Sequence, residues 1–187
     1  MEPDLHVAAE VESFVREAFA LMPDRLRHIQ VIAERVRQSA RDINELNPGQ
    51  NIDEVLAYVA ALLHDIGYST RAAQTGFHPL DGYNFLCAHE ARDIAELIVG
   101  HSCSPEEAEL LGLVLPPPGD HLISSLITYW DMQVKQGGEI VSYDERLADI
   151  VRRYGEHSIT GRANLDAEQR IRGIIGQIDR LLHKKGQ

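Results

Sequence analysis

With 187 residues, the chain has the length of one domain and can bury a substantial hydrophobic core. Its formal net charge of −11, together with the lack of any basic run, excludes duplex nucleic acid and an anionic membrane surface as expected partners. A small phosphorylated substrate remains compatible with this charge, because bound divalent cations would reverse the sign of the field inside a cleft.

Cysteine usage and hydropathy indicate the compartment. Cys87 and Cys103 form neither a CxxC motif nor a disulfide framework, which is typical of a reducing cytoplasm. The first residues are acidic and lack the apolar stretch of a secretory signal. The longest apolar run, residues 57–63, is too short to span a bilayer. We therefore expect a cytoplasmic protein with no membrane partner, either monomeric or a homo-oligomer.

In the N-terminal part of the chain, apolar residues recur every three or four positions, as in an amphipathic helix. This spacing predicts helices over about residues 4–21 and 24–43. After a Pro-Gly breaker, the next apolar run predicts a third helix, which we expect to be capped by Asn51 with Glu54 three residues later. Gly67 is expected to end this helix.

Helix signals continue beyond the polar loop that follows Gly67. Pro79 suits the first turn of the next helix, and a further helix is expected over about residues 91–100. Ser104 followed by proline and then by Glu107 is a strong start signal, with the serine as the expected cap.

The C-terminal part is predicted to be helical as well. After a proline-rich loop at 115–119, a helix is expected to carry Asp131, and two adjacent glycines predict a short β-hairpin near 133–141. A capping box starts a helix over 142–154, and isoleucines and leucines line one face of the last helix, over about 171–182. With no repeat or linker in between, we predict one all-α domain, a helical bundle of residues 1–187.

Four histidines and two aspartates lie in or beside apolar helical stretches, where an imidazole or a carboxylate is costly without a partner. A metal site built from nitrogen and oxygen ligands is the simplest partner for all of them. In chain order they are His28, His64, Asp65, His78, His101 and Asp131.

Asp65 is the most informative of the six. It ends the run LAYVAALLHD, where an unpaired carboxylate would lose several kcal/mol to desolvation. Successive helical residues point about 100° apart, so His64 and Asp65 need not bind one ion in the same way. A carboxylate has two oxygens, so Asp65 could hold two ions while His64 binds only one.

Each histidine also has a simpler interpretation. His28 alone is more typical of a core histidine that is hydrogen-bonded to a backbone carbonyl, since apolar residues lie one turn further on. Taken alone, neither His78 at a helix start nor His101 at a helix end indicates a metal site. The six residues together favour the metal site.

The order H…HD…D on predicted helices resembles the HD-domain superfamily of metal-dependent phosphohydrolases. ALLHDIGY is the most specific segment, and the likeness covers about residues 25–135. The segments GFHPLDGYNFL, with His78, and LIVGHS, with His101, match the members that hold two metals. The resemblance implies an HD core at about 22–135, followed by C-terminal helices at about 142–184.

The resemblance also implies which residues bind which ion. The first ion would be held by His28, His64, Asp65 and Asp131, and the second by His78 and His101 with Asp65 as the bridge. This set of imidazoles and carboxylates suits one or two ions of Mn, Fe, Co, Ni or Zn and argues against a cysteine-rich structural zinc site.

The chain departs from the family pattern in one place. Many members have a lysine where this chain has Tyr68, and in some subfamilies that lysine takes part in the reaction. The chain also lacks the GYP signature of the cyclic-dinucleotide phosphodiesterases and the Glu-Asp pair of the alarmone hydrolases.

Two ions a few ångströms apart would lower the pKa of a bridging water and supply a hydroxide nucleophile at neutral pH. Asp65 is therefore a predicted catalytic residue as well as a ligand. Arg71, on the loop that returns to His78, is a candidate phosphate contact, although a solvated loop charge explains it equally well. Asp81 is either an acceptor that orients His78 or an acidic residue in a helix's first turn.

Three functions remain open. The first is hydrolysis of a small phosphoester, with a nucleotide as the foremost candidate, by a metal-activated water. The second is a diiron oxygenase of the HD superfamily that acts on a small organic substrate. The third is a metal-stabilised sensing module without turnover. Iron content and oxygen consumption separate the first two, and turnover on a phosphoester panel separates the third.

Overall fold

The computed structural model describes residues 4–117, 119 and 121–183, and this part of the chain consists of helices without a β-sheet. The predicted all-α fold is confirmed. The helices are α1 (Ala8–Ala18), α2 (Pro23–Leu46), α3 (Glu54–Leu63), the 3₁₀ turn η1 (Ile66–Tyr68), α4 (His78–Ala88), α5 (Arg92–Ile98), α6 (Ser104–Leu111), α7 (Leu122–Asp131), α8 (Tyr143–Tyr154), α9 (Ile159–Asp166) and α10 (Glu168–Leu182).

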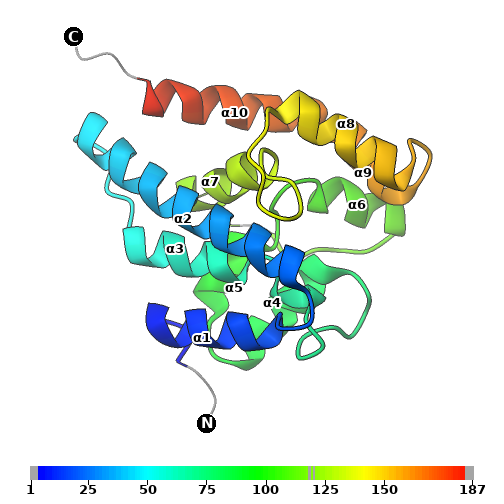
Figure 1. Ribbon diagram of the computed structural model, residues 1–187, viewed down its shortest axis with the longest axis horizontal. Coiled ribbons are helices and arrows are strands. Elements are labelled where there is room, and N and C mark those ends of the chain that lie inside the picture. Colours follow the sequence, from blue (N-terminus) through cyan, green and yellow to red (C-terminus); the bar gives the residue numbers. More distant parts are fainter. Residues whose placement is uncertain (1–3, 118, 120, 184–187) are drawn as a thin grey trace.

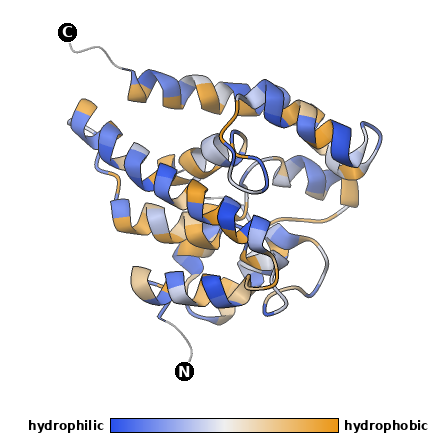
Figure 2. Ribbon diagram, viewed as in Figure 1, coloured by the Kyte–Doolittle hydropathy of each residue, from blue (hydrophilic) through white to orange (hydrophobic). Residues whose placement is uncertain are grey.

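The long helix α2 crosses the middle of the molecule, with α1 and α10 on opposite sides of it (Figure 1). It packs against α3 and α7, and α10 packs against α7. Both α2 and α10 alternate between hydrophobic and hydrophilic residues along their length (Figure 2), as expected for helices that bury one face. Local amphipathic spacing therefore produces the helices, and burial of their apolar faces assembles the bundle.

Two hydrophobic clusters form the interior. The larger one joins residues of α1, α2, α3, α5 and α7, and the smaller one lies under α8, α9 and α10. Cys103 and Met132 belong to the smaller cluster, and they follow His101 and Asp131 closely in the chain. The predicted ligands thus lie where the two clusters meet.

The helix starts differ from the expectation in two places. Asp53, not Asn51, caps α3, because its carboxylate accepts hydrogen bonds from two backbone N–H groups of the first turn. Ser104 lies inside α6, and its hydroxyl donates to the carbonyl of His101 at 2.6 Å instead of capping the helix. The capping box of Ser142 at the start of α8 is confirmed.

The C-terminal part contains one helix, α9, that the sequence pattern did not predict. The expected hairpin consists of a single antiparallel bridge between Val134 and Ile140. Its two backbone hydrogen bonds run from the N–H of Lys135 to the carbonyl of Glu139 and from the N–H of Val141 to the carbonyl of Gln133.

Gly67 allows a close approach that the site depends on. A Cβ at this position would lie 2.0 Å from the carbonyl oxygen of His78 and 2.8 Å from the backbone nitrogen of Gly82. Only a glycine therefore lets η1 pack directly on α4. This contact brings the turn that carries Asp65 against the helix that begins at His78.

Within the described residues, no helix has both the length and the apolar character needed to cross a membrane.

Candidate metal centre

The structure brings the six predicted ligands together, although they come from five separate parts of the chain. Three overlapping groups have ligand atoms within 4.8 Å of one another, and all six residues take part in at least one group. The groups are His28, His64 and Asp65; His64, His101 and Asp131; and Asp65, His78 and His101. We call these six residues the metal centre.

Asp65 lies in the middle of the metal centre. Its Oδ2 atom is 3.6 Å from Nε2 of His64 and 3.9 Å from Nε2 of His28. Its Oδ1 atom is 3.7 Å from Nε2 of His78 and 3.8 Å from Nε2 of His101. Each carboxylate oxygen therefore faces a different pair of imidazoles.

Backbone carbonyls orient three of the imidazoles. Nδ1 of His64 lies 2.7 Å from the carbonyl oxygen of Ala61, and Nδ1 of His101 lies 2.6 Å from the carbonyl oxygen of Ile98. In His28, Nδ1 lies 3.2 Å from the carbonyl oxygen of Lys135. A proton held on Nδ1 leaves the lone pair of Nε2 directed at the centre, as in metal-binding histidines.

One polar atom at the centre lacks a partner. Nε2 of His64 is buried and has no hydrogen-bond partner among the described residues. A buried polar atom without a partner is rare in folded proteins, and a metal ion would satisfy this one. The donor set, its orientation and this unpartnered atom all fit a divalent transition metal.

A family model described as HD domain matches residues 25–171, which is more than half of the chain. The chain belongs to the HD-domain family. The match continues past residue 135, through α8 and α9 and into α10, further than the likeness read from the motifs. No curated protein and no solved structure gives a significant match.

HD domains bind divalent metals, and the electrostatics of this HD site suit that role. Burial disfavours the imidazolium form, so it lowers the pKa of His78 to about 3 despite the nearby Asp65. Burial also lowers the pKa of His101. Burial alone would raise the pKa of Asp65, but the surrounding His64 and Arg25 outweigh it and hold that pKa well below the usual range. Neutral imidazoles around a carboxylate are the forms that bind a metal.

Arg25 is a residue of the HD site that the sequence interpretation missed. Its Nη1 atom lies 2.6 Å from Oδ2 of Asp65, and its guanidinium group is 3.9 Å above the ring of Tyr68. The ring of Tyr68 in turn stacks on that of His78, with centroids 4.0 Å apart. The position one helical turn before His28 was a signal that could have identified Arg25.

Ser102 is a second residue that the sequence did not point to. Its hydroxyl donates a hydrogen bond to Oδ2 of Asp131, and its backbone N–H donates to Oγ1 of Thr128 at 3.1 Å. The other oxygen of Asp131 lies 3.0 Å from Nε2 of His28. Ser102 therefore helps to orient a ligand from a distant helix.

The structure does not bring Arg71 to the HD site. Its guanidinium group forms an ion pair with Glu17 at 2.9 Å and lies 5.2 Å from the ring centroid of Phe14. The loop that carries Arg71 turns toward α1, because those two residues offer the guanidinium an anion and an aromatic face.

Asp81 does not orient His78 either. Its carboxylate accepts hydrogen bonds from the backbone N–H groups of residues 74, 75 and 76 and from the hydroxyl of Thr75. Asp81 thus stabilises the loop that leads to α4.

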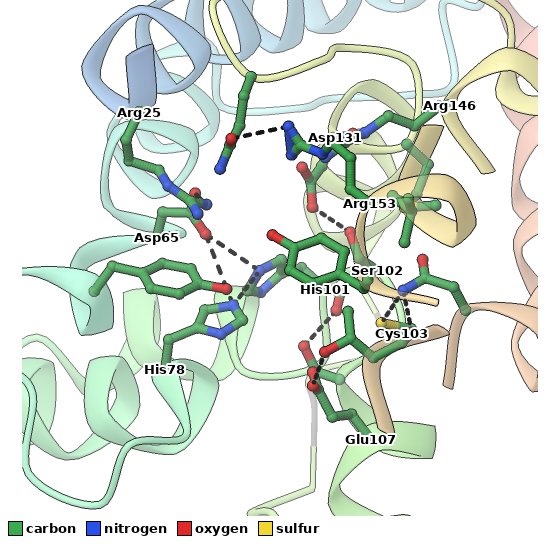
Figure 3. Close-up of a pocket in the computed structure, with 18 residues that line it drawn as sticks. Arg25, Asp65, His78, His101, Ser102, Cys103, Glu107, Asp131, Arg146 and Arg153 are labelled. Atoms are coloured by element: carbon green, nitrogen blue, oxygen red, sulfur yellow. Dashed lines mark hydrogen bonds and ion pairs between the residues drawn. The ribbon is translucent and has the colours of Figure 1, made fainter. Parts of the chain in front are cut away.

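A pocket of about 90 Å³ opens beside the metal centre. Its wall includes residues of α8 and α9, which lie beyond the HD core that the motifs suggested. Figure 3 shows Arg25, Arg146 and Arg153 in the upper part of the pocket with Asp131 among them, and Glu107 at the bottom, with His78 and His101 at intermediate height.

Proposed function

We propose that this HD-domain protein is a phosphohydrolase that uses two divalent ions to cleave a small phosphoester. The observation that carries the proposal is the position of Asp65, whose two oxygens face two different pairs of imidazoles. Bound divalent ions would supply a nucleophilic water at neutral pH and would neutralise charge on the phosphoryl oxygens. Most members of the HD family are hydrolases, in agreement with this assignment.

The residues of the metal centre have separate tasks in this proposal. The imidazoles hold the ions, and the backbone carbonyls behind them keep each Nε2 atom directed inward. Asp65 would contribute the negative charge that makes two close cations tolerable. Asp65 is for this reason the residue on which turnover depends most.

Three arginines support an anionic substrate, and we define them as the arginine side: Arg25, Arg146 and Arg153. All three line the pocket. Nη1 of Arg146 is buried without a hydrogen-bond partner among the described residues, and Asp149 is 3.9 Å away from it. Arg153 forms an ion pair with Asp149 at 3.5 Å through Nε, and its Nη1 donates to Gln136 at 3.0 Å, a neutral partner that a phosphoryl oxygen could replace. Arginines bind phosphate through charge-assisted and bidentate hydrogen bonds.

The size of the pocket argues for a small substrate. Pockets that enclose a drug-sized ligand are roughly 300–1,000 Å³, whereas this cavity is about 90 Å³. A phosphoryl group with a short alcohol fits such a volume. The nucleoside part of a nucleotide would have to stay outside it, so we place small phosphomonoesters ahead of the nucleotides that the sequence favoured.

The test is phosphate release from a panel of small phosphomonoesters and nucleoside monophosphates, with protein purified without chelator and its metal content determined. We expect turnover that depends on added Mn or Co and is abolished by a chelator. Absence of phosphate release with Mn, Fe, Co, Ni and Zn would overturn the proposal. Iron-dependent oxygen uptake in its place would favour the diiron oxygenase, and no turnover of either kind would favour the sensing module.

A further inference from the structure

The side of the pocket away from the arginines has the opposite chemistry. It is formed by one residue of α6 and two of α9, which we call the acceptor side: Glu107, Thr160 and Asn164. In Figure 3, Glu107 lies across the pocket from Arg146 and Arg153. Nothing in the proposed hydrolysis of the phosphoester bond uses this side.

Glu107 presents a carboxylate without a cation. Its Oε1 atom accepts a hydrogen bond from the hydroxyl of Thr160 at 3.1 Å, and it forms no ion pair within the described part of the chain. The neighbouring Glu106 is different, because both of its oxygens accept from Arg170, at 2.8 and 2.7 Å. Burial raises the pKa of Glu107, so a cationic ligand would relieve the cost of the buried charge.

Asn164 adds an unused acceptor to the same side. The residue is 3% exposed. Its Nδ2 donates to the carbonyl oxygen of Thr160 at 2.9 Å and contacts Sγ of Cys103 at 3.1 Å, so both amide hydrogens are used. Its Oδ1 atom is buried and has no hydrogen-bond partner among the described residues. Buried acceptors are nearly always paired, so this atom calls for a donor.

We propose that the acceptor side binds an ammonium group, which makes the substrate class the phosphomonoesters of small amino alcohols. An ammonium group offers three donors and a positive charge, and thus satisfies Asn164 and Glu107 together. A hydroxyl group would leave the charge of Glu107 unbalanced. The phosphoryl end would lie at the metal centre and the arginine side, and this half of the inference rests on the proposed function.

The test compares two phosphonates that cannot be hydrolysed and that differ only in the charged group. The first is 3-aminopropylphosphonate, and the second is butylphosphonate, in which a methyl group replaces the ammonium. Isothermal titration calorimetry with the metal-containing protein should show at least tenfold tighter binding of the amino compound. In Glu107→Gln this preference should fall to about twofold or less, while the affinity for butylphosphonate stays the same.

Glu106→Gln is the matched control. It removes the same charge one residue away, and it should keep the preference because Glu106 is paired with Arg170 and does not line the pocket. Melting curves of each variant verify folding. The comparison of the two phosphonates in the wild type does not depend on any variant.

Two outcomes would overturn the inference. One is equal binding of the two phosphonates, or binding of neither, by the wild type. The other is an unchanged preference in folded Glu107→Gln. A clear preference for the amino compound in a protein that releases no phosphate from any ester would refute the proposed function and leave the ammonium site standing.

Discussion

The hydroxyl of Ser102 donates a hydrogen bond to the carboxylate of Asp131, 29 positions further along the chain. Ser102 follows directly after the predicted ligand His101 and has a left-handed backbone with a φ of 52°. Asp131 ends α7, while Ser102 belongs to the turn after α5. The bond therefore orients one ligand of the metal centre from the backbone next to another.

Ser102→Ala should weaken metal binding without unfolding the protein. Loss of a residue that orients a ligand typically lowers metal affinity about 10- to 100-fold. Competition with a chromophoric chelator would measure this change. Ser142→Ala is the control, because it removes the cap of α8 and should cost about 1 kcal/mol of stability while leaving metal affinity intact. Equal metal affinity of Ser102→Ala and wild type would refute the orienting role.

Asp65→Asn should lower phosphoesterase activity by several orders of magnitude. The change removes the charge that faces both pairs of imidazoles, so bound-metal stoichiometry should fall along with turnover. Helical content should stay near that of the wild type, because the apolar faces are buried without the metal. Steady-state kinetics, metal analysis and circular dichroism test these three points. Asp93→Asn, at an exposed aspartate, should change none of them, and unchanged activity in Asp65→Asn would exclude the bridging role.

Arg153→Gln and Arg71→Gln should differ, although each removes one arginine. Arg153 lines the pocket, so its loss should raise KM for a small phosphomonoester about tenfold, the effect of a lost charge-assisted hydrogen bond of roughly 1.5 kcal/mol. Arg71 pairs with Glu17, away from the pocket, and its loss should leave KM unchanged. Steady-state kinetics of both variants measure these KM values. A raised KM in Arg71→Gln together with an unchanged KM in Arg153→Gln would restore Arg71 as the phosphate contact.

Gly67→Ala should destabilise the protein by about 3 kcal/mol, because the added methyl group overlaps the backbone of α4 and forces η1 away. Gly173→Ala gives the opposite result in the same chain. A Cβ there meets nothing within 4 Å, and alanine in a helix interior should add about 0.5–1 kcal/mol. Urea denaturation of both variants provides the measurement. Near-equal stabilities would show that the contact between η1 and α4 is looser than described.

Asp81 should make stability depend on acid pH. Burial by itself raises its pKa, but the hydrogen bonds from Thr75 and the neighbouring backbone outweigh burial and hold the pKa below the ordinary 3.8. A depressed carboxyl pKa stabilises the fold above the ordinary value, and this contribution is lost as pH falls through the folded-state value. The free energy of unfolding of Asp81→Asn should be about 1–2 kcal/mol lower than that of the wild type at pH 7. On further acidification it should fall by less than the free energy of unfolding of the wild type.

Urea denaturation of metal-free protein at several pH values between about 2 and 7 would measure this dependence. Asp93→Asn serves again as the control, since its carboxylate is exposed and contacts the ring of His6 instead of a set of backbone N–H groups. Parallel pH profiles of Asp81→Asn and wild type would show that the loop bonds contribute nothing to acid stability.

The helices could be predicted because their signal is local. Amphipathic spacing and caps are properties of a few neighbouring residues, so α2, α8 and α10 were recognisable from the sequence alone. The short α9 was missed because its eight residues, ITGRANLD, alternate small and polar positions without an apolar stripe. Its position depends on Gly161, where a Cβ would lie 2.0 Å from the carbonyl oxygen of Gly155.

The six residues of the metal centre were recognisable for an equally local reason. A histidine or an aspartate in an apolar stretch is costly, and that cost can be read from its neighbours in the sequence. The partners of these residues could not be read in this way. Arg25 and Asp65 are 40 positions apart, and Arg71 and Glu17 are 54 apart. Arg25 lies one helical turn before His28, but the sequence around it does not show that its guanidinium group reaches Asp65.

The sequence by itself determined the helical fold and which residues can bind metal, because both follow from the polarity of neighbouring residues. Only the tertiary structure decided how they act together. Packing of η1 on α4 brings Asp65 and His78 together, and packing of α6, α8 and α9 brings Arg153 and Glu107 to opposite sides of one cavity. These relationships depend on how apolar faces far apart in the chain are buried together, which no short stretch of sequence encodes.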